Sequence, residues 1–211
     1  MDLFLKGPAG KLEAKLWEPT DGSAPLAVAV FCHPHPLHGG TMDNKVVFRS
    51  ARGLQHAGLA VLRFNFRGVR RSAGVHDGQG GEVDDLGAAL DYMAVRYPGA
   101  RLWAGGFSFG ARTAAQRALS DARIERLVLV ALPVLAFDVS YVRDVKQPGF
   151  IVMADRDEYG TLADLKRKFP GIEERFETTE IANSGHFFDE TNRELEERVR
   201  DYAERALGKR T

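Results

Sequence analysis

Four continuous apolar runs set the strongest constraint on how this chain of 211 residues folds. They are rich in branched side chains and occupy residues 26–32, 59–66, 127–132 and 150–153. Strands covered on both faces have this composition, whereas a strand with one wet face alternates apolar and polar residues. Patterns of helical period separate the runs, over residues 43–56, 82–97 and 108–119. Alternating strands and helices predict an α/β fold with a doubly wound, mostly parallel sheet.

The two ends of the chain extend this pattern. Residues 3–5 and 11–17 flank a Gly-Pro-Ala-Gly turn, which predicts an edge hairpin. The last third predicts a short helix, an alternating strand and a closing amphipathic helix over residues 162–169, 175–181 and 191–207. The one long irregular segment, residues 67–81, is expected to be a loop. The length suits a single domain over residues 1–211.

The charge composition excludes a strong electrostatic partner. Lys plus Arg equals Asp plus Glu at 29 each, so the net charge gives no reason to expect nucleic acid or an anionic membrane as partner. The N-terminus lacks a basic segment followed by an apolar one, and no apolar run reaches the length of a membrane span. We expect a cytoplasmic protein. Cys32 is the only cysteine, cannot form an internal disulfide, and is expected to be a buried structural thiol.

Residues 106–110, Gly-Phe-Ser-Phe-Gly, match the pattern G-x-S-x-G between a predicted strand and a predicted helix. In such a nucleophile elbow Ser108 occupies a strained turn, and side chains at Gly106 and Gly110 would collide with the adjacent strand and helix. The Ser108 hydroxyl then lies at the helix N-terminus, where partial positive charge favours a developing anion. A glycine-rich turn with an ordinary capping serine is the alternative.

A serine hydroxyl is a weak nucleophile at neutral pH and needs a histidine base that a carboxylate orients. His186 follows the last predicted strand, and sites in doubly wound sheets form beyond the carboxyl ends of strands. The acid is expected just after the run at 150–153, where Asp157 is the first choice and Asp155 its rival. Asp138, after the preceding strand, is a more distant candidate.

The oxyanion of an acyl transfer reaction also needs hydrogen-bond donors. The backbone N–H of Phe109, next to the predicted nucleophile, is one donor, and the loop at residues 33–40 is expected to supply the other. Pro34 and Pro36 have no N–H and stiffen the backbone around His35, so the His35 N–H is the predicted second donor. The three histidines of this loop also suggest a metal site, but no carboxylate lies among them, so we expect no metal.

Other loop residues are assigned to substrate and to support. His38, Arg67 and Arg70 are predicted to bind substrate, and the arginines would favour an anionic leaving group. A solvated loop is the alternative explanation for those charges. Phe187 and Phe188 are expected to anchor the histidine loop.

With these motifs together, the sequence resembles the α/β-hydrolase superfamily, and within it the small lidless bacterial serine hydrolases of the dienelactone hydrolase-like group. The resemblance rests on HPHPLHGGTMDNKVV (33–47), FNFRGVRRSAG (64–74), GFSFG (106–110), DRDE (155–158) and SGHFF (184–188). It implies an eight-stranded, mostly parallel sheet without a cap domain, with the nucleophile at Ser108, the acid at Asp157 and the base at His186. The chain departs from the commoner pattern at His33-Pro34, where the oxyanion loop often begins His-Gly.

These features predict a serine hydrolase that cleaves short-chain carboxylic esters or thioesters through an acyl-enzyme. Only residues 133–148 separate the last two apolar runs, enough for a loop and one short helix but not for a cap, so the site should be open. Lactone or C–C bond hydrolysis by the same triad is an alternative, and so is a non-catalytic binding module on the same fold. We expect a small-molecule ester as partner, no cofactor, and a monomer or homodimer.

Overall fold

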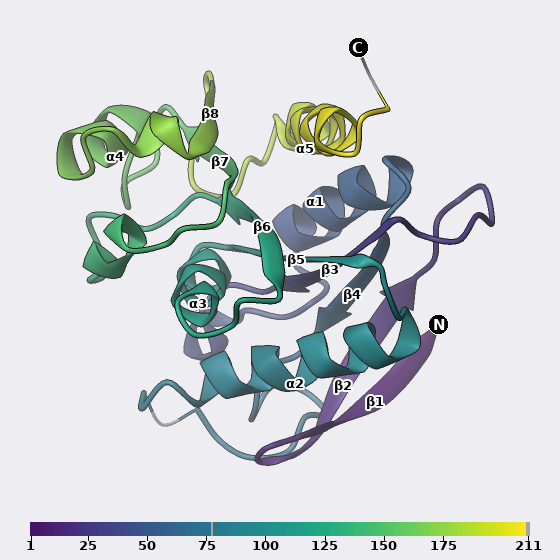
Figure 1. Cartoon of the computed structure of the whole chain (residues 1–211). Helices are drawn as coiled ribbons and strands as arrows, with labels where there is room; N and C mark the ends of the chain where they lie inside the picture. The colour runs from purple at the N-terminus through teal and green to yellow at the C-terminus, as the bar shows by residue number, and fades with distance from the viewer. Residues whose placement is uncertain (77, 210–211) are drawn as a thin grey trace.

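The computed structural model describes residues 1–76 and 78–209, and in these residues eight strands form one sheet in the order β1-β2-β4-β3-β5-β6-β7-β8 (Figure 1). The strands are β1 (Asp2–Gly7), β2 (Gly10–Trp17), β3 (Ala27–Cys32), β4 (Ala60–Phe64), β5 (Arg101–Phe107), β6 (Ile124–Val130), β7 (Gly149–Ala154) and β8 (Phe176–Ile181). β1 and β2 form the predicted antiparallel hairpin, and every pair from β4 to β8 is parallel. The doubly wound, mostly parallel fold expected from the apolar runs is thereby confirmed.

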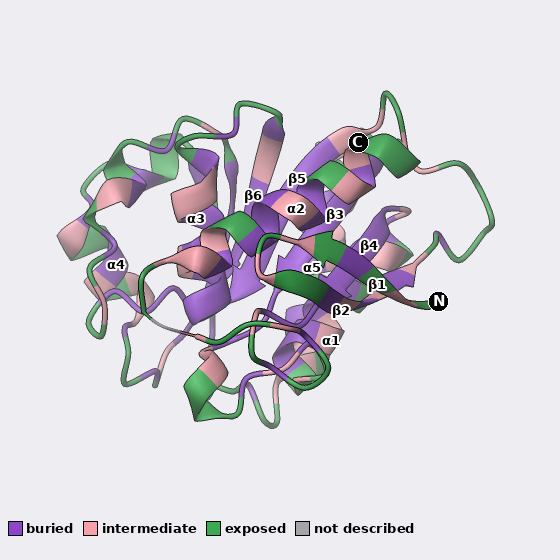
Figure 2. Cartoon of the chain, turned by 90° about the horizontal axis from the view of Figure 1, so that it is seen from below, coloured by how far each residue is buried: buried purple, intermediate pink, exposed green. Residues whose placement is uncertain are grey.

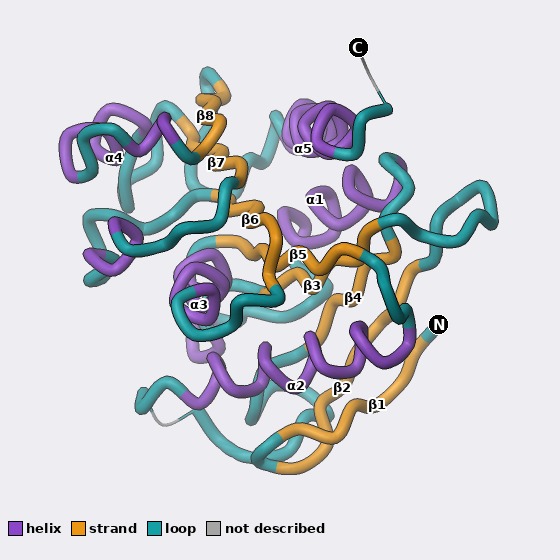
Figure 3. The backbone as a smooth tube through the Cα atoms, in the orientation of Figure 1, coloured by secondary structure: helices purple, strands orange, loops and turns teal. Residues whose placement is uncertain are grey.

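Helices cover both faces of this sheet. They are α1 (Lys45–His56), α2 (Gly81–Arg96), α3 (Phe109–Ala118), α4 (Leu162–Lys168) and α5 (Asn192–Ala206), with short 3₁₀ turns η1 (Pro36–His38), η2 (Ser140–Arg143) and η3 (Ile172–Glu174). α1 and α5 lie together on one face, and α2 and α3 lie on the other (Figures 1 and 3). α1 begins two residues later than the sequence pattern predicts because the Asn44 side chain accepts the Val46 N–H at 2.9 Å and caps the helix.

The core lies in two layers on either side of the sheet. All residues of β3, β4 and β7 are buried, as strands covered on both faces require. Figure 2 shows β3 and β4 in the colour of buried residues. Alternate β3 residues serve the two layers: Val28 and Val30 pack with the layer under α2 and α3, and Ala29 and Phe31 with the layer under α1 and α5. The sheet is therefore a rigid base for the loops at its carboxyl edge.

The described chain carries no cap domain. Between β6 and β7, residues 131–148 contain only η2 as regular structure, as the length of this connection predicts. The connection between β4 and α2 is irregular as expected, although position 77 within it lies outside the described residues. In the part of the chain that the structure describes, no helix is long and apolar enough to cross a membrane.

Candidate active site

Ser108 occupies the sharp turn between β5 and α3. Its backbone has φ 54° and ψ −115°, a conformation that costs a residue other than glycine about 1–3 kcal/mol. The Ser108 N–H donates to the Val130 carbonyl of β6 at 2.9 Å, which holds the strained turn. A Cβ on Gly106 would lie 2.3 Å from the Gly110 carbonyl carbon, and a Cβ on Gly110 would lie 2.4 Å from the Cys32 oxygen. The predicted need for both glycines is confirmed.

Ser108, His186 and Asp157 form one hydrogen-bonded relay. His186 Nε2 lies 3.0 Å from Ser108 Oγ, and His186 Nδ1 lies 2.7 Å from Asp157 Oδ2. The second Asp157 oxygen accepts the Tyr159 N–H at 2.8 Å, so the carboxylate is held at both oxygens. A carboxylate can only accept, so Nδ1 carries the imidazole proton and Nε2 presents a lone pair to the hydroxyl. The structure thus brings the three predicted residues together, each no more than 8% exposed.

The two rival carboxylates have other contacts. Asp155 accepts the Ser184 N–H at 2.8 Å and the Asn183 N–H at 2.9 Å, and these bonds lower the pKa of its carboxyl. It therefore ties down the loop that carries the histidine. Asp138 is exposed and accepts the Ser140 N–H at 2.9 Å, at the start of η2. Of the three candidate acids, only the one at position 157 hydrogen-bonds to the imidazole.

Only one of the two phenylalanines that follow His186 anchors its loop in the core. Phe188 is fully buried, whereas Phe187 is 48% exposed. The prediction that both anchor the loop is wrong for Phe187, which lines the cavity beside Ser108 instead. The rings of Phe107 and Tyr159 lie 4.9 and 4.6 Å from the imidazole of His186, so aromatic contacts enclose it.

The two predicted oxyanion donors are backbone N–H groups without a partner among the described residues. The Phe109 N–H is the first of α3, and neither it nor the His35 N–H has an acceptor among the described residues. The Pro34 carbonyl accepts from His33 Nδ1 at 2.6 Å. In a trans peptide the C=O and the following N–H point in opposite directions, so the His35 N–H points away from the His33 ring. The role of both N–H groups as oxyanion donors stays a prediction.

His33 is a structural histidine. It is fully buried, and its Nε2 accepts the Phe66 N–H at 3.0 Å while Nδ1 donates to the Pro34 carbonyl. Burial lowers the pKa of His33 to about 4, so the ring is neutral and joins the loops after β3 and β4. A Cβ on Gly40 would lie 2.1 Å from the Pro34 oxygen, which shows how tightly this loop folds back. Among the described residues, no group of three or more His, Cys, Asp and Glu side chains is arranged to hold a metal ion.

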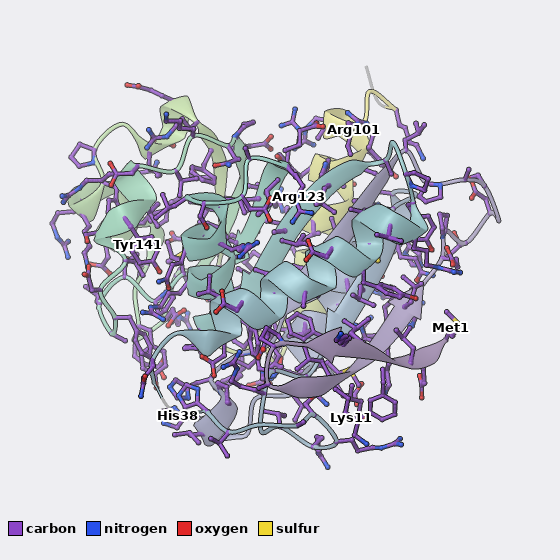
Figure 4. The ribbon with its side chains drawn as sticks, turned by 60° about the horizontal axis from the view of Figure 1, so that its bottom comes forward. Met1, Lys11, His38, Arg101, Arg123 and Tyr141 are labelled. Atoms are coloured by element: carbon purple, nitrogen blue, oxygen red, sulfur yellow. The ribbon has the colours of Figure 1, made fainter. Side chains whose placement is uncertain are left out.

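A cavity of about 280 Å³ opens at the Ser108 hydroxyl. Rings form much of its wall, contributed by His35, His38, Phe137, Tyr159 and Phe187. Figure 4 shows His38 and Arg101 at opposite ends of the molecule, and since Arg101 begins β5, the cavity lies at the carboxyl edge of the sheet. Phe137 and Tyr159 carry no motif that predicts their place in this wall from the sequence. The position of Tyr159 just after the candidate acid is the only signal that marks it.

The structure corrects the predicted substrate contacts of Arg67 and Arg70. Arg67 Nε and Nη2 donate to the two oxygens of Asp85 at 3.0 and 2.8 Å, and the Arg67 N–H donates to the same carboxylate at 2.9 Å. The Asp85 side chain is fully buried and requires such a partner. Arg70 is exposed with φ 53°, and neither arginine is among the described residues that line the cavity. His38 does line it, and its contact with substrate stays a prediction.

The comparisons with known proteins agree with this arrangement. The sequence profile of the family described as an alpha/beta hydrolase domain matches residues 27–208. The chain therefore belongs to the α/β-hydrolase family. An uncharacterised protein of Rickettsia prowazekii is 34% identical over 209 residues, which cover 95% of this chain and 87% of that protein.

Two solved structures are similar over nearly the whole chain. A structure of an α/β serine hydrolase homologue from Coxiella burnetii has 36% identity and a TM-score of 0.89, and covers 96% of each chain. A Xanthomonas campestris protein described as an α/β serine hydrolase without lid has 32% identity and a TM-score of 0.88, and covers 98% of this chain and 94% of that one. The predicted resemblance to lidless α/β serine hydrolases is confirmed.

Proposed function

We propose that this protein hydrolyses small carboxylic esters or thioesters through an acyl-enzyme on Ser108. The observation that carries the proposal is the relay from Asp157 through His186 to Ser108, with contacts of 2.7 and 3.0 Å, at the edge of a ring-lined cavity. A binding module would not need a strained serine turn or a histidine held at both ring nitrogens. Family membership supports hydrolysis in general, and the ester substrate is our inference.

In the proposed reaction His186 Nε2 takes the Ser108 proton as Oγ attacks the ester carbonyl. Asp157 keeps the other proton on Nδ1 and stabilises the imidazolium that forms. The negative charge on the former carbonyl oxygen is bound by the N–H groups of Phe109 and His35. When the tetrahedral intermediate collapses, His186 gives its proton to the leaving alkoxide or thiolate. Water, deprotonated by the same nitrogen, then attacks the acyl-enzyme, and the carboxylic acid leaves.

The shape of the cavity favours short acyl groups. Its volume of about 280 Å³ is just below the roughly 300–1,000 Å³ of pockets that bind drug-sized ligands. No cap is present in the described chain to cover a longer chain. Lactone hydrolysis by the same residues is the second candidate, since the attack on a cyclic ester carbonyl has the same geometry.

The test combines covalent labelling with turnover. A fluorophosphonate probe should modify the wild-type protein at Ser108, as peptide mapping can establish, and should not label Ser108→Ala. p-Nitrophenyl acetate, phenyl thioacetate and a small lactone, assayed beside the same variant, separate the substrate classes. Labelling at another serine, or equal turnover by Ser108→Ala, would exclude the proposed nucleophile.

A further inference from the structure

Asn44 lines the cavity beside Ser108 and is also the N-cap of α1. Its Oδ1 accepts the Val46 N–H at 2.9 Å, and its own carbonyl accepts the Phe48 N–H at 2.9 Å. Its backbone N–H donates to the Thr41 carbonyl at 3.0 Å. Three of the four polar groups of this residue are therefore committed to the start of the helix.

The fourth polar group of Asn44, the side-chain NH2, is available to a ligand. It has no acceptor among the described residues, and it is not one of the polar atoms buried without a partner. The cap fixes the orientation of the amide, since exchanging Oδ1 and Nδ2 would set the NH2 against the N–H of Val46. Because Oδ1 faces the first turn of α1, the NH2 points away from the helix. It is thus the group that Asn44 offers to a molecule in the cavity.

The walls of the cavity come from both faces of the sheet. Phe137 packs against the core layer under α2 and α3. Asn44 and His186 come from the other face. Each lies two residues before a side chain of the core layer under α1 and α5, namely Val46 and Phe188. The amide donor therefore lies on the same side of the cavity as the imidazole, and the ring of Phe137 lies on the opposite side.

The start of α1 and the histidine loop also meet directly. Lys45, the first residue of α1, forms an ion pair of 2.8 Å with Asp189, three residues after His186. In the proposed reaction His186 Nε2 gives its proton to the leaving alkoxide, so the alcohol part of the substrate lies on the imidazole side of the cavity. The acyl group, bonded to the same carbon, then lies on the Phe137 side.

We propose that Asn44 selects the alcohol part of the substrate, an inference that rests on the proposed ester hydrolysis. Its NH2 donates to an oxygen atom that the alcohol carries close to the ester, such as an ether or carbonyl oxygen. The preferred substrates are then esters of short oxygenated alcohols and not esters of plain alkanols. A site that hydrogen-bonds to its substrate rejects the analogue without the acceptor, because the donor is then cut off from water and left unpaired.

The experiment compares 2-methoxyethyl acetate with butyl acetate, in which a methylene replaces the ether oxygen and the length is unchanged. Acid release in a pH-stat gives kcat/KM for both esters. The wild-type protein should prefer the ether by more than the ratio of their rates of alkaline hydrolysis. Asn44→Ser should lower that preference by about threefold or more, the effect of one neutral hydrogen bond. Asn44→Asp, which presents an oxygen in place of the NH2, should lower it further.

The variants separate the NH2 group from the helix cap. Serine and aspartate are both good N-caps, so Asn44→Ser and Asn44→Asp should melt close to the wild-type protein, whereas Asn44→Ala should melt earlier. Thr161→Ala is the matched control, because the Thr161 side chain caps α4 by accepting the Asp164 N–H and does not line the cavity. It should melt earlier and keep the preference for the ether.

The outcomes also separate this inference from the proposed function. Suppose that both acetates are hydrolysed, that Ser108→Ala abolishes this activity, and that Asn44→Ser and Asn44→Asp keep the wild-type preference. The role of Asn44 is then excluded and the hydrolase stands. An equal loss of preference in Thr161→Ala would show that helix capping sets it. Folded protein that hydrolyses neither acetate contradicts the inference, and if p-nitrophenyl acetate and phenyl thioacetate also fail, the proposed function is excluded as well.

Discussion

The two halves of the carboxyl edge use their polar residues differently. After β7 and β8, the side chains of Asp157 and His186 point toward Ser108. Asp155 fixes the loop that carries His186. After β3 and β4, His33 and Arg67 are polar residues that the sequence offered as candidates for function. Their side chains instead form hydrogen bonds that hold the loops to the rest of the fold. A polar side chain in a buried loop must first satisfy its neighbours, and only what remains is available for chemistry.

The largest effect should separate Asp157 from Asp155. Asp157→Asn would favour the wrong imidazole tautomer and should lower kcat for p-nitrophenyl acetate by roughly 10⁴-fold. Asp155→Asn keeps the relay, but its single amide oxygen can accept only one of the two loop N–H groups that the carboxylate holds, so its kcat should fall far less while its thermal stability falls. Steady-state kinetics and thermal melts of the two variants make the comparison. A larger loss of kcat in Asp155→Asn would show that the loop, and not the tautomer, limits turnover.

The second effect tests whether Arg67 is structural. Asp85→Ala removes the carboxylate from its ion pair with Arg67, and breaking a buried pair in this way costs about 3–5 kcal/mol of unfolding free energy. The double variant Arg67→Met, Asp85→Leu should recover much of that loss, as chemical denaturation can measure. The ratio of kcat/KM for 4-acetoxybenzoate to that for its methyl ester should not change in Arg67→Met. A selective loss for the anionic ester would restore a substrate role for this arginine.

The sequence predicted most of the fold because the apolar runs are long and continuous. It also predicted the relay, since glycine spacing and position after a strand restrict where Ser108 and His186 can lie. The sequence could not distinguish Asp155 from Asp157 as the triad acid. The two residues are two positions apart in the same turn after β7, so their side chains would point to the same side of an extended chain. Only the three-dimensional course of the loop separates them. The structural role of Arg67 could not be predicted either, because its partner Asp85 lies on α2, beyond an irregular loop.

The third effect concerns His33 and pH. Its pKa is lowered from 6.5 to about 4 by burial, so the unfolded chain binds the proton more tightly than the folded one. The stability that neutral His33 contributes is complete above pH 6.5 and is lost as pH falls toward 4. Between about pH 7 and about pH 5 this group alone should lower the unfolding free energy by about 2 kcal/mol.

Comparison of wild-type protein with His33→Gln isolates that contribution, since the other titrating groups are common to both. The variant should be less stable at pH 7 and should lose less stability on acidification, as urea denaturation at both pH values would show. Parallel pH profiles in the two proteins would mean that His33 is not buried neutral in solution.

The smallest effect, counted for each methylene group, is the dependence of kcat/KM on acyl chain length. It tests how far the cavity beside Ser108 encloses the acyl chain. Each methylene buried in the cavity contributes about 0.8 kcal/mol, or about a fourfold gain in kcat/KM. At about 280 Å³ the cavity fills after a few carbons, and Phe187 in its wall is 48% exposed, so a longer acyl chain would face water. For p-nitrophenyl esters from acetate to palmitate, kcat/KM should rise over the first members and then stop rising. Phe137→Ala removes a ring from the wall and should move the optimum to longer acyl groups, whereas an optimum at about twelve carbons in the wild-type protein would mean that a surface outside this cavity binds the chain.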